Sequence, residues 1–227
     1  MNKKTLNLIW QFAIFISLTL VILGAYFYAP LAKGLKEFTR VLYFHVPSAW
    51  VTVVAFLVGA YYSVRYLKDR TLIYDSYAEA ANQLGIAFCI ITTITGAMWA
   101  KASWGAYWNW DPRETSIFIL LLIYGAYFSL RSAVDQDETR ARLSAVYDIL
   151  AFITVPFFIF IVPRIYESLH PDPIINSEAK MHMDGKMLLV FLTSLTTFTI
   201  IFFWMLSMKK NLIHVKNKLE LLGEHNA

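Results

Sequence analysis

Six stretches of the chain contain no charged residue and consist mainly of apolar side chains. About 20 apolar residues span the hydrocarbon core of a bilayer as a helix, and four of the stretches are 19 to 22 residues long. The fourth and fifth, of 16 and 15 residues, reach that length only if their flanks also enter the membrane. We therefore predict an all-α, polytopic membrane protein in which residues 1–227 form a single domain with six transmembrane helices. The stretches cover residues 8–28, 46–64, 80–100, 115–130, 149–163 and 187–208.

The composition agrees with a membrane protein and excludes several other classes. Hydrophobic residues make up 58 % and charged residues 16 % of the 227 residues, whereas a soluble domain is roughly half apolar and about a quarter charged. This excludes a disordered chain and a nucleic-acid-binding module. The single cysteine, Cys89, excludes an internal disulfide bond and a cysteine-rich metal site. The chain has no Gly-x-x-x-x-Gly-Lys-Ser/Thr motif, so any ATP dependence must come from a partner.

The basic residues predict the orientation, because Lys and Arg favour cytoplasmic loops. With the N-terminus inside, 12 of the 20 Lys and Arg residues lie on the inner side and 8 on the outer side. Both termini are then cytoplasmic, and residues 29–45, 101–114 and 164–186 are the outer segments. The inner set is Lys3, Lys4, Arg65, Lys68, Arg70, Arg131, Arg140, Arg142, Lys209, Lys210, Lys216 and Lys218.

The two ends of the chain fit this orientation. The first apolar stretch is too long for the apolar region of a signal peptide, so we expect it to be retained as a transmembrane helix. Residues 209–227 alternate Lys with apolar residues. That pattern predicts an inner-face helix near anionic lipid.

Aromatic residues are concentrated in the second outer segment, where residues 101–116 contain the run Trp-Gly-Ala-Tyr-Trp-Asn-Trp-Asp. Four of the seven Trp residues lie between Trp99 and Trp110. An aromatic belt would distribute its Trp residues over many helix ends, whereas clustered indoles suit a large planar ligand. Trp104 and Trp108 would share a face if the segment is helical, and Gly105 would let a flat ligand approach the backbone. Belt or core packing is the alternative interpretation.

The residues that follow the last of these tryptophans form a helix-start pattern. Asp111 is a favoured N-cap, Pro112 fits the first helical position, and Glu114 completes a capping box. We therefore expect Asp111 to start the fourth helix and to fix where the tryptophans point. Arg113 lies on the same outer surface, where it can pair with an anionic group of a ligand.

Three of the five histidines, His45, His170 and His182, lie in outer segments, and the other two, His214 and His225, belong to the inner tail, where a solvated histidine is expected. We expect Pro47 to occupy the first turn of the second helix, which places His45 just outside the helix N-terminus. The positive end of a helix favours a neutral imidazole, the form that binds metals. Two histidines beside a tryptophan cluster suggest axial ligands of haem iron. His45 and His170 are the first candidates, and His182 is the alternative to His170.

These residues carry a resemblance to a known family. The sequence Trp104-Gly-x-Tyr-Trp-x-Trp-Asp-x-Arg resembles the tryptophan-rich WWD signature of haem-handling membrane proteins. With six spans and this length, the chain is similar over nearly its whole length to haem exporter protein C of the cytochrome c maturation system. Arg40, the stretch His45-Val-Pro-Ser-Ala-Trp, and a histidine in the last outer segment belong to the same resemblance. The run Asp111-Pro-Arg-Glu-Thr is closer to the cytochrome c synthetase branch of the superfamily.

The resemblance implies a function without a reaction of its own. Haem b would be held at the periplasmic face of the inner membrane and presented to a membrane-anchored haem chaperone. An ATP-binding cassette subunit and a second membrane subunit would assist its release. His45 and His170 would be the axial ligands and Arg40 and Arg113 the electrostatic support. Trp104, Trp108 and Trp110 would form the platform, with Asp111 positioning it.

Two other functions compete with this one. A cytochrome c synthetase, which joins haem to an apocytochrome, would need a large outer domain, yet the longest outer segment has 23 residues. A transporter subunit whose tryptophans act only as anchors would bind no haem. Because no histidine lies between residues 46 and 169, we predict a single haem site.

Overall fold

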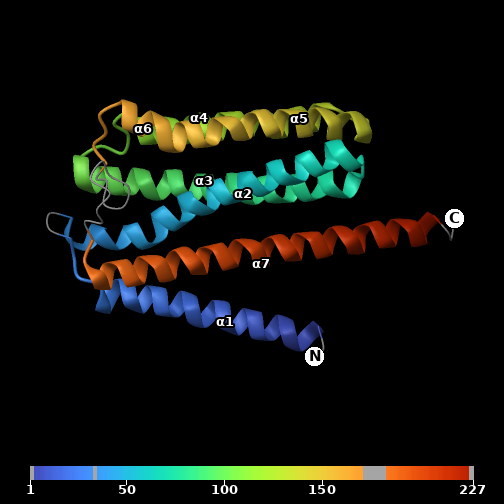
Figure 1. Cartoon of the computed structure of the whole chain (residues 1–227). Coiled ribbons are helices and arrows are strands. Elements are labelled where there is room, and N and C mark those ends of the chain that lie inside the picture. Colours follow the sequence, from blue (N-terminus) through green and yellow to red (C-terminus); the bar gives the residue numbers. More distant parts are fainter. Residues whose placement is uncertain (1–2, 33–34, 171–182, 225–227) are drawn as a thin grey trace.

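The chain folds into a bundle of long helices, as the sequence predicts (Figure 1). A computed structural model describes residues 3–32, 35–170 and 183–224, and among these no β-strand occurs. Six helical segments are long and apolar enough to cross a membrane, which confirms the all-α fold with six spans. The elements are α1 (Lys3–Leu23), the π-helix η1 (Gly24–Tyr28), the 3₁₀-helix η2 (Lys36–Val41), α2 (Leu42–Asp69), α3 (Leu72–Trp104), α4 (Pro112–Ala133), α5 (Asp137–Pro156), the π-helix η3 (Phe157–Ile161), α6 (Val162–Ile165) and α7 (Gly185–Glu224).

The two short apolar stretches become spans because their charged flanks are helical. Helix α4 has 22 residues, and α5, η3 and α6 together form a segment of 29 residues, Asp137–Ile165. At the end of α4, Arg131 is buried and forms a two-pronged ion pair with Asp75 of α3, at 2.6 and 2.9 Å. Arg131 also contacts Glu79 at 2.8 Å. Pairing of this kind lets a charged residue lie inside a helix bundle.

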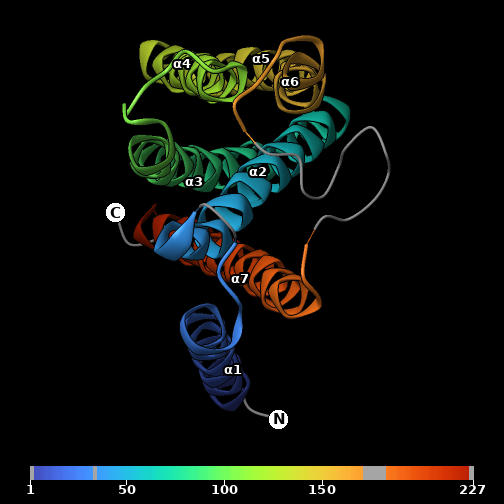
Figure 2. The ribbon, with the colours of Figure 1, turned by 90° about the vertical axis from the view of Figure 1, so that its left-hand side faces the viewer.

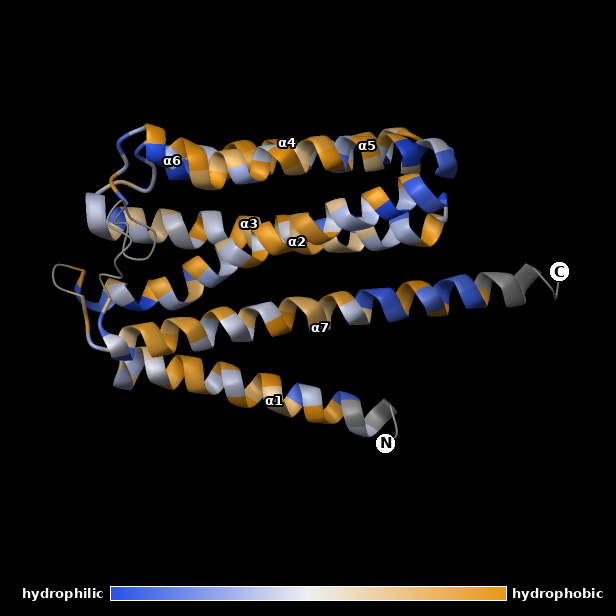
Figure 3. Cartoon of the chain, viewed as in Figure 1, coloured by the Kyte–Doolittle hydropathy of each residue, from blue (hydrophilic) through white to orange (hydrophobic). Residues whose placement is uncertain are grey.

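The helices are arranged in layers (Figure 2). Helices α4 and α5 lie on one side of α2 and α3, and α7 lies on the other side, with α1 packed against α7 at the edge. Apolar residues occur along all the long helices (Figure 3). Many of their large side chains are exposed, among them Trp10, Phe12 and Phe15 on α1. An apolar outer surface of this kind fits a lipid environment. The start of α1 and the end of α7 lie at the same end of the bundle. The opposite end, where α3 stops at Trp104, is called the tryptophan end below.

Close contact between α2 and α3 depends on small residues. A Cβ atom at Gly85 would lie 2.5 Å from the ring of Phe56, and one at Gly59 would lie 2.1 Å from the Asn82 amide oxygen. Small residues that let helix backbones approach are the usual basis of helix association in membranes. The two helices that carry the tryptophan end are therefore held in a fixed relation.

The start of the second span differs from the prediction. Helix α2 begins at Leu42, so His45 lies within the helix and Pro47 is internal to it. Because proline has no N–H, the carbonyl of Tyr43 loses its donor within the helix. The hydroxyl of Ser194, on α7, donates to that carbonyl instead. Because Ser194 satisfies the Tyr43 carbonyl, Pro47 can lie inside the helix and need not start it.

This replacement hydrogen bond should be measurable in the stability of the protein. Ser194→Ala leaves the Tyr43 carbonyl buried without a donor, and we expect it to lower the free energy of unfolding by about 1–3 kcal/mol. Thr193→Ala is the matched control, since the exposed Thr193 hydroxyl bonds only the carbonyl of Leu189 in its own helix. Thermal unfolding of both variants in the same detergent gives the comparison. Equal stability of the two would contradict this explanation of Pro47.

The helix at the end of the chain is not the separate surface helix that the sequence had led us to expect. Residues from Lys209 to Glu224 are helical, as predicted, but they continue α7 without a break. His214 is exposed, as expected of a solvated histidine, and its Nε2 atom lies 2.5 Å from the hydroxyl of Tyr77. His225 and His182 lie outside the described residues.

Candidate functional site

The tryptophan end is shaped by a sharp stop of α3. Gly105 adopts a left-handed conformation with φ of 87°, and its N–H donates to the carbonyl of Lys101. A positive φ of this kind favours glycine, which is the usual residue after a helix end. Trp104 is therefore the last residue of α3, and the segment after it is not helical. Trp104 and Trp108 consequently do not share a helical face.

The start of α4 follows the predicted capping pattern. The carboxylate of Asp111 accepts the N–H of Arg113 at 2.9 Å. The carboxylate of Glu114 accepts the N–H groups of Asn109, at 2.7 Å, and of Asp111, at 3.4 Å. This capping box fixes the backbone that carries Trp108 and Trp110.

Asp111 also holds a segment that is distant in sequence. Its carboxylate accepts hydrogen bonds from the Leu169 N–H at 2.7 Å and from the Ser168 hydroxyl at 3.0 Å. The Nδ1 atom of His170 lies 2.9 Å from the same carboxylate. The Asp111 side chain is completely buried by these contacts. One carboxylate therefore both starts α4 and orients His170, a role that the local motif did not predict.

The charges at this point favour an ionised aspartate and a neutral histidine. Burial opposes ionisation of Asp111, but hydrogen bonds from the Arg113 and Leu169 backbones hold its pKa below the ordinary value. Burial lowers the pKa of His170; the Asp111 charge opposes this shift, and the Arg113 charge adds to it. His170 therefore remains in the neutral form that binds metals.

The imidazole of His45 is held by a hydrogen bond to α3. Its Nδ1 atom lies 3.0 Å from the hydroxyl oxygen of Thr95, on α3. The Thr95 hydroxyl donates its own hydrogen to the carbonyl of Ile91, at 2.7 Å, so its oxygen accepts from His45. With the Thr95 hydrogen donated to Ile91, His45 would carry its proton on Nδ1. Gly96 makes room for the ring, because a Cβ there would lie 2.9 Å from His45 Cε1.

The two histidines share one arrangement. In each, the Nδ1 atom lies within hydrogen-bond distance of an oxygen, of Thr95 for His45 and of Asp111 for His170, which leaves Nε2 as the nitrogen that could bind a metal. The two imidazoles also lie within electrostatic range of each other. A histidine that ligates a metal through one nitrogen typically donates its other N–H to a carboxylate, carbonyl or water. The donor set therefore fits a metal with two axial imidazoles.

Indole rings enclose His170. Trp99 is stacked against the imidazole with ring centroids 5.6 Å apart, and Trp104 meets it edge-on at 4.8 Å. The two indoles contact each other at 5.0 Å. Trp99 was counted in the sequence cluster but not named as a site residue. Residues five apart on a helix do not share a face, so the spacing of Trp99 and Trp104 gave no local signal for this contact.

The other two tryptophans form a separate cluster. Trp108 packs edge-on against Trp110, at 5.8 Å, and against Phe118, at 5.9 Å. Trp110 has a positive φ of 57° and is 74 % exposed, a backbone conformation that is uncommon for a residue other than glycine.

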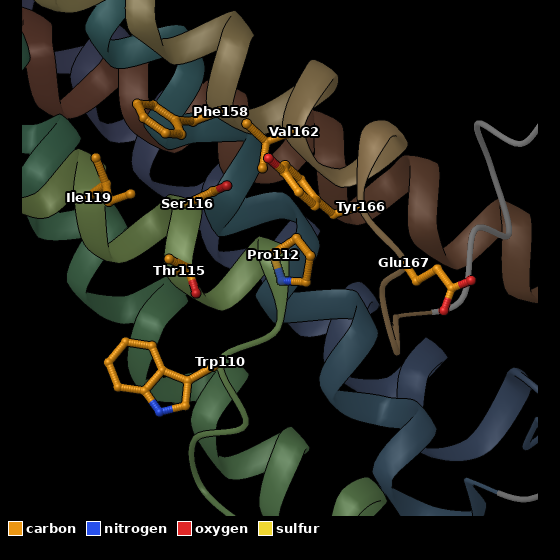
Figure 4. Close-up of a pocket in the computed structure, with 9 residues that line it drawn as sticks. All are labelled: Trp110, Pro112, Thr115, Ser116, Ile119, Phe158, Val162, Tyr166 and Glu167. Carbon is orange, nitrogen blue, oxygen red and sulfur yellow. The ribbon is translucent and has the colours of Figure 1, made fainter.

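Trp110 borders a cavity of about 410 Å³ between α4 and the segment formed by η3 and α6. The side chains that line the cavity are drawn in Figure 4, and neither His45 nor His170 is among them. The structure thus divides the predicted platform of Trp104, Trp108 and Trp110 into two clusters.

The two arginines occupy different environments. Arg40 contacts Glu37 at 2.6 Å, donates to the carbonyl of Ala25 and lies over the ring of Tyr26. These contacts join η2 to the end of the first span. Arg113 lies at the start of α4, where its charge acts on His170.

The fold and the paired histidines define a multi-pass helical membrane protein with a candidate metal-ligand pair at one end of the bundle. The chain belongs to the family described as Heme exporter protein C, whose model matches residues 1–221.

Individual relatives show the extent of the similarity. A Heme exporter protein C of Bradyrhizobium diazoefficiens is 32 % identical over 163 residues, which cover 72 % of this chain and 62 % of the relative. One of Rhodobacter capsulatus is 35 % identical over 121 residues, covering 53 % and 50 %. One of Haemophilus influenzae is 26 % identical over 221 residues, covering 93 % and 85 %. The match to the first two relatives thus spans about half to three fifths of their length.

Proposed function

We propose that this chain binds haem b through the Nε2 atoms of His45 and His170 and presents it to a membrane-anchored haem chaperone for cytochrome c maturation. The observation that carries the proposal is the shared arrangement of the two imidazoles, each held through Nδ1. Two axial imidazoles leave no open coordination position on the iron, which suits a protein that carries haem rather than one that activates oxygen. The family name supports the same ligand.

Several residues would hold haem in place without ligating it. Trp99 and Trp104, beside His170, offer ring faces and edges to a flat ligand. Arg113 and Arg40 are the cations proposed to support the propionates. Asp111 would act through His170 by fixing the direction of the imidazole. Cys89 is buried within α3, so thioether attachment is not available and the haem would be bound non-covalently.

We expect the tryptophans to contribute by contact rather than by ligation. A contact of this kind contributes about 1 kcal/mol, so Trp104→Phe should be partly tolerated. Joint replacement of Trp104, Trp108 and Trp110 by Ala should abolish haem retention or delivery. Haem content after purification, with Trp10→Ala on the exposed face of α1 as control, measures the effect. If the triple variant retains and delivers haem normally, Trp104, Trp108 and Trp110 do not form a haem platform.

The site would lie at the periplasmic face of the inner membrane, with both termini in the cytoplasm. The support is the excess of Lys and Arg in the loops at the end of the bundle that carries both termini. We expect a cysteine replacing Asn109 to react with a membrane-impermeant thiol reagent from outside. A cysteine replacing Gln136 should not react. Labelling of the Gln136 position in intact spheroplasts would reverse the orientation.

We propose no catalytic reaction for this chain. Release of haem would depend on an ATP-binding cassette subunit and a second membrane subunit, since the chain has no phosphate-binding motif. The alternatives are a cytochrome c synthetase and a haem-free transporter subunit.

The visible spectrum of the purified protein tests the proposal. A six-coordinate haem spectrum supports it, whereas protein that binds no haem supports the haem-free subunit. Formation of a thioether product with a Cys-x-x-Cys-His peptide would support the synthetase.

A further inference from the structure

A carboxyl group lies inside the bundle, apart from the candidate haem site. The side chain of Asp148, on α5, is completely buried. Its Oδ2 atom accepts a hydrogen bond from the hydroxyl of Ser63, on α2, at 2.7 Å. Its Oδ1 atom has no hydrogen-bond partner among the described residues. Acidic residues inside membrane-spanning bundles are rare and usually have a function, so the charge state of this carboxyl group matters.

The groups around Asp148 are polar but uncharged. The amide of Asn82, on α3, is completely buried, and neither its oxygen nor its nitrogen has a hydrogen-bond partner in the described part of the chain. This amide lies beside both Asp148 and the hydroxyl of Tyr127, on α4. No water molecule can touch these unpartnered atoms. Asp148 therefore has only protein groups as neighbours.

The cation that acts on Asp148 is already paired. Arg131 exerts its charge on Asp148, but its guanidinium contacts the carboxylates of Asp75, at 2.6 Å, and Glu79, at 2.8 Å. An ionised Asp148 would be a third carboxylate for one guanidinium, and it would be repelled by Asp75. The titratable or charged groups that face Asp148 are Asp75 on α3 and Tyr124, Tyr127 and Arg131 on α4, while α2 faces it with Ser63 and η3 has only apolar side chains.

A proton is the ligand that suits these surroundings. A buried carboxylate with neither water nor a paired cation is far less stable than the neutral acid. A metal ion needs space among several oxygen ligands, whereas the unpartnered oxygens border no space that even a water molecule could enter. A protonated Asp148 can donate its Oδ1–H to the Asn82 oxygen, and the Asn82 amino group can then donate to Tyr127.

We propose that Asp148 is a proton-binding site within the membrane, where a carboxylic acid that is protonated at neutral pH accepts from Ser63 and donates to Asn82. The bound proton holds α5 against α2 and α3. Loss of the proton leaves an unpaired charge between these helices and weakens their packing. A core cluster that includes Phe56, Leu120 and Val155 lies between Asp148 and the tryptophan end, so this site is independent of the haem site.

The infrared spectrum of the full chain tests the proposal, in a maltoside detergent that has no carbonyl group. A protonated carboxylic acid has a C=O band that a carboxylate lacks. We expect this band in the parent protein at neutral pH and its loss in Asp148→Asn. Asp135→Asn, which changes an exposed carboxylate, is the matched control and should retain the band. In the parent, alkaline pH should remove the same band.

Thermal unfolding at a series of pH values gives a second measurement. Asparagine at position 148 can accept from Ser63 and donate to Asn82 as the neutral acid does, so Asp148→Asn should fold and retain the haem content of the parent. The folded parent binds its proton more firmly than the unfolded chain, so its stability should fall as the pH rises. Asp148→Asn should lack this part of the pH dependence.

Four results would overturn the proposal. The first is a parent spectrum without an acid band that Asp148→Asn removes, which would show an ionised carboxylate. The second is an identical pH dependence of stability in the parent and Asp148→Asn. The third is failure of Asp148→Asn to fold. The fourth is stabilisation of the parent, but not of Asp148→Asn, when sodium chloride replaces choline chloride, which would identify the ligand as a metal cation.

Discussion

Purified His45→Ala and His170→Ala proteins are each expected to lose six-coordinate haem. Either variant removes one Nε2 ligand, and the haem should become five-coordinate or be lost during purification. Among the described residues, no other histidine lies at the tryptophan end, since His214 is bonded to Tyr77 at the opposite end. The measurement is the haem content and visible spectrum of each variant.

Two further variants make this result specific. His214→Ala should leave both haem content and spectrum unchanged. His182→Ala tests the alternative second ligand, because residue 182 lies outside the described residues and belongs to the same outer segment as His170. Retention of six-coordinate haem in both His45→Ala and His170→Ala would disprove the assigned ligands.

Asp111→Asn is expected to weaken haem binding about 10- to 100-fold, the usual effect of removing the partner of a metal-ligating histidine. Asparagine is also a good N-cap, so helix α4 should still start normally. The loss of the negative charge beside His170 makes the imidazole a poorer donor to iron, and the reduction potential of the haem should rise. Haem titration and redox potentiometry measure the two effects.

The comparison variants separate the two roles of Asp111. Asp111→Ala removes the cap as well, and it should lower the free energy of unfolding by about 2–4 kcal/mol, because the buried donors of residues 168–170 lose their acceptor. Glu114→Gln preserves an acceptor for Asn109 and also removes a nearby negative charge that acts on His170, but it leaves the hydrogen bond from the imidazole to Asp111 in place. If Asp111→Asn and Glu114→Gln leave haem affinity and potential equally unchanged, Asp111 is only a helix cap.

The sequence was sufficient for features that depend on local composition. Charge-free stretches predicted six spans because length and apolarity alone decide whether a helix can cross a bilayer. The capping box at Asp111 was predicted because its hydrogen bonds join residues within a few positions of one another. The apolar stretches were shorter than the helices because paired charges, such as Arg131 with Asp75, can lie within a span.

The remaining features depend on contacts between distant residues. Asp111 and His170 are 59 residues apart, and no local pattern relates the cap of one helix to a histidine in a later segment. His45 was predicted just outside the second helix but lies within it. The hydroxyl of Ser194 donates to the Tyr43 carbonyl, the acceptor that Pro47 leaves without an N–H donor. The grouping of Trp99 and Trp104 with His170, apart from Trp108 and Trp110, follows from the abrupt end of α3 at Gly105.

The most direct test of the paired-imidazole site is the low-temperature electron paramagnetic resonance spectrum of the purified parent protein with its haem oxidised. Two Nε2 ligands predict a low-spin ferric signal with the g values of bis-imidazole haem, at one haem per chain. A high-spin signal, or two haems per chain, would contradict the account.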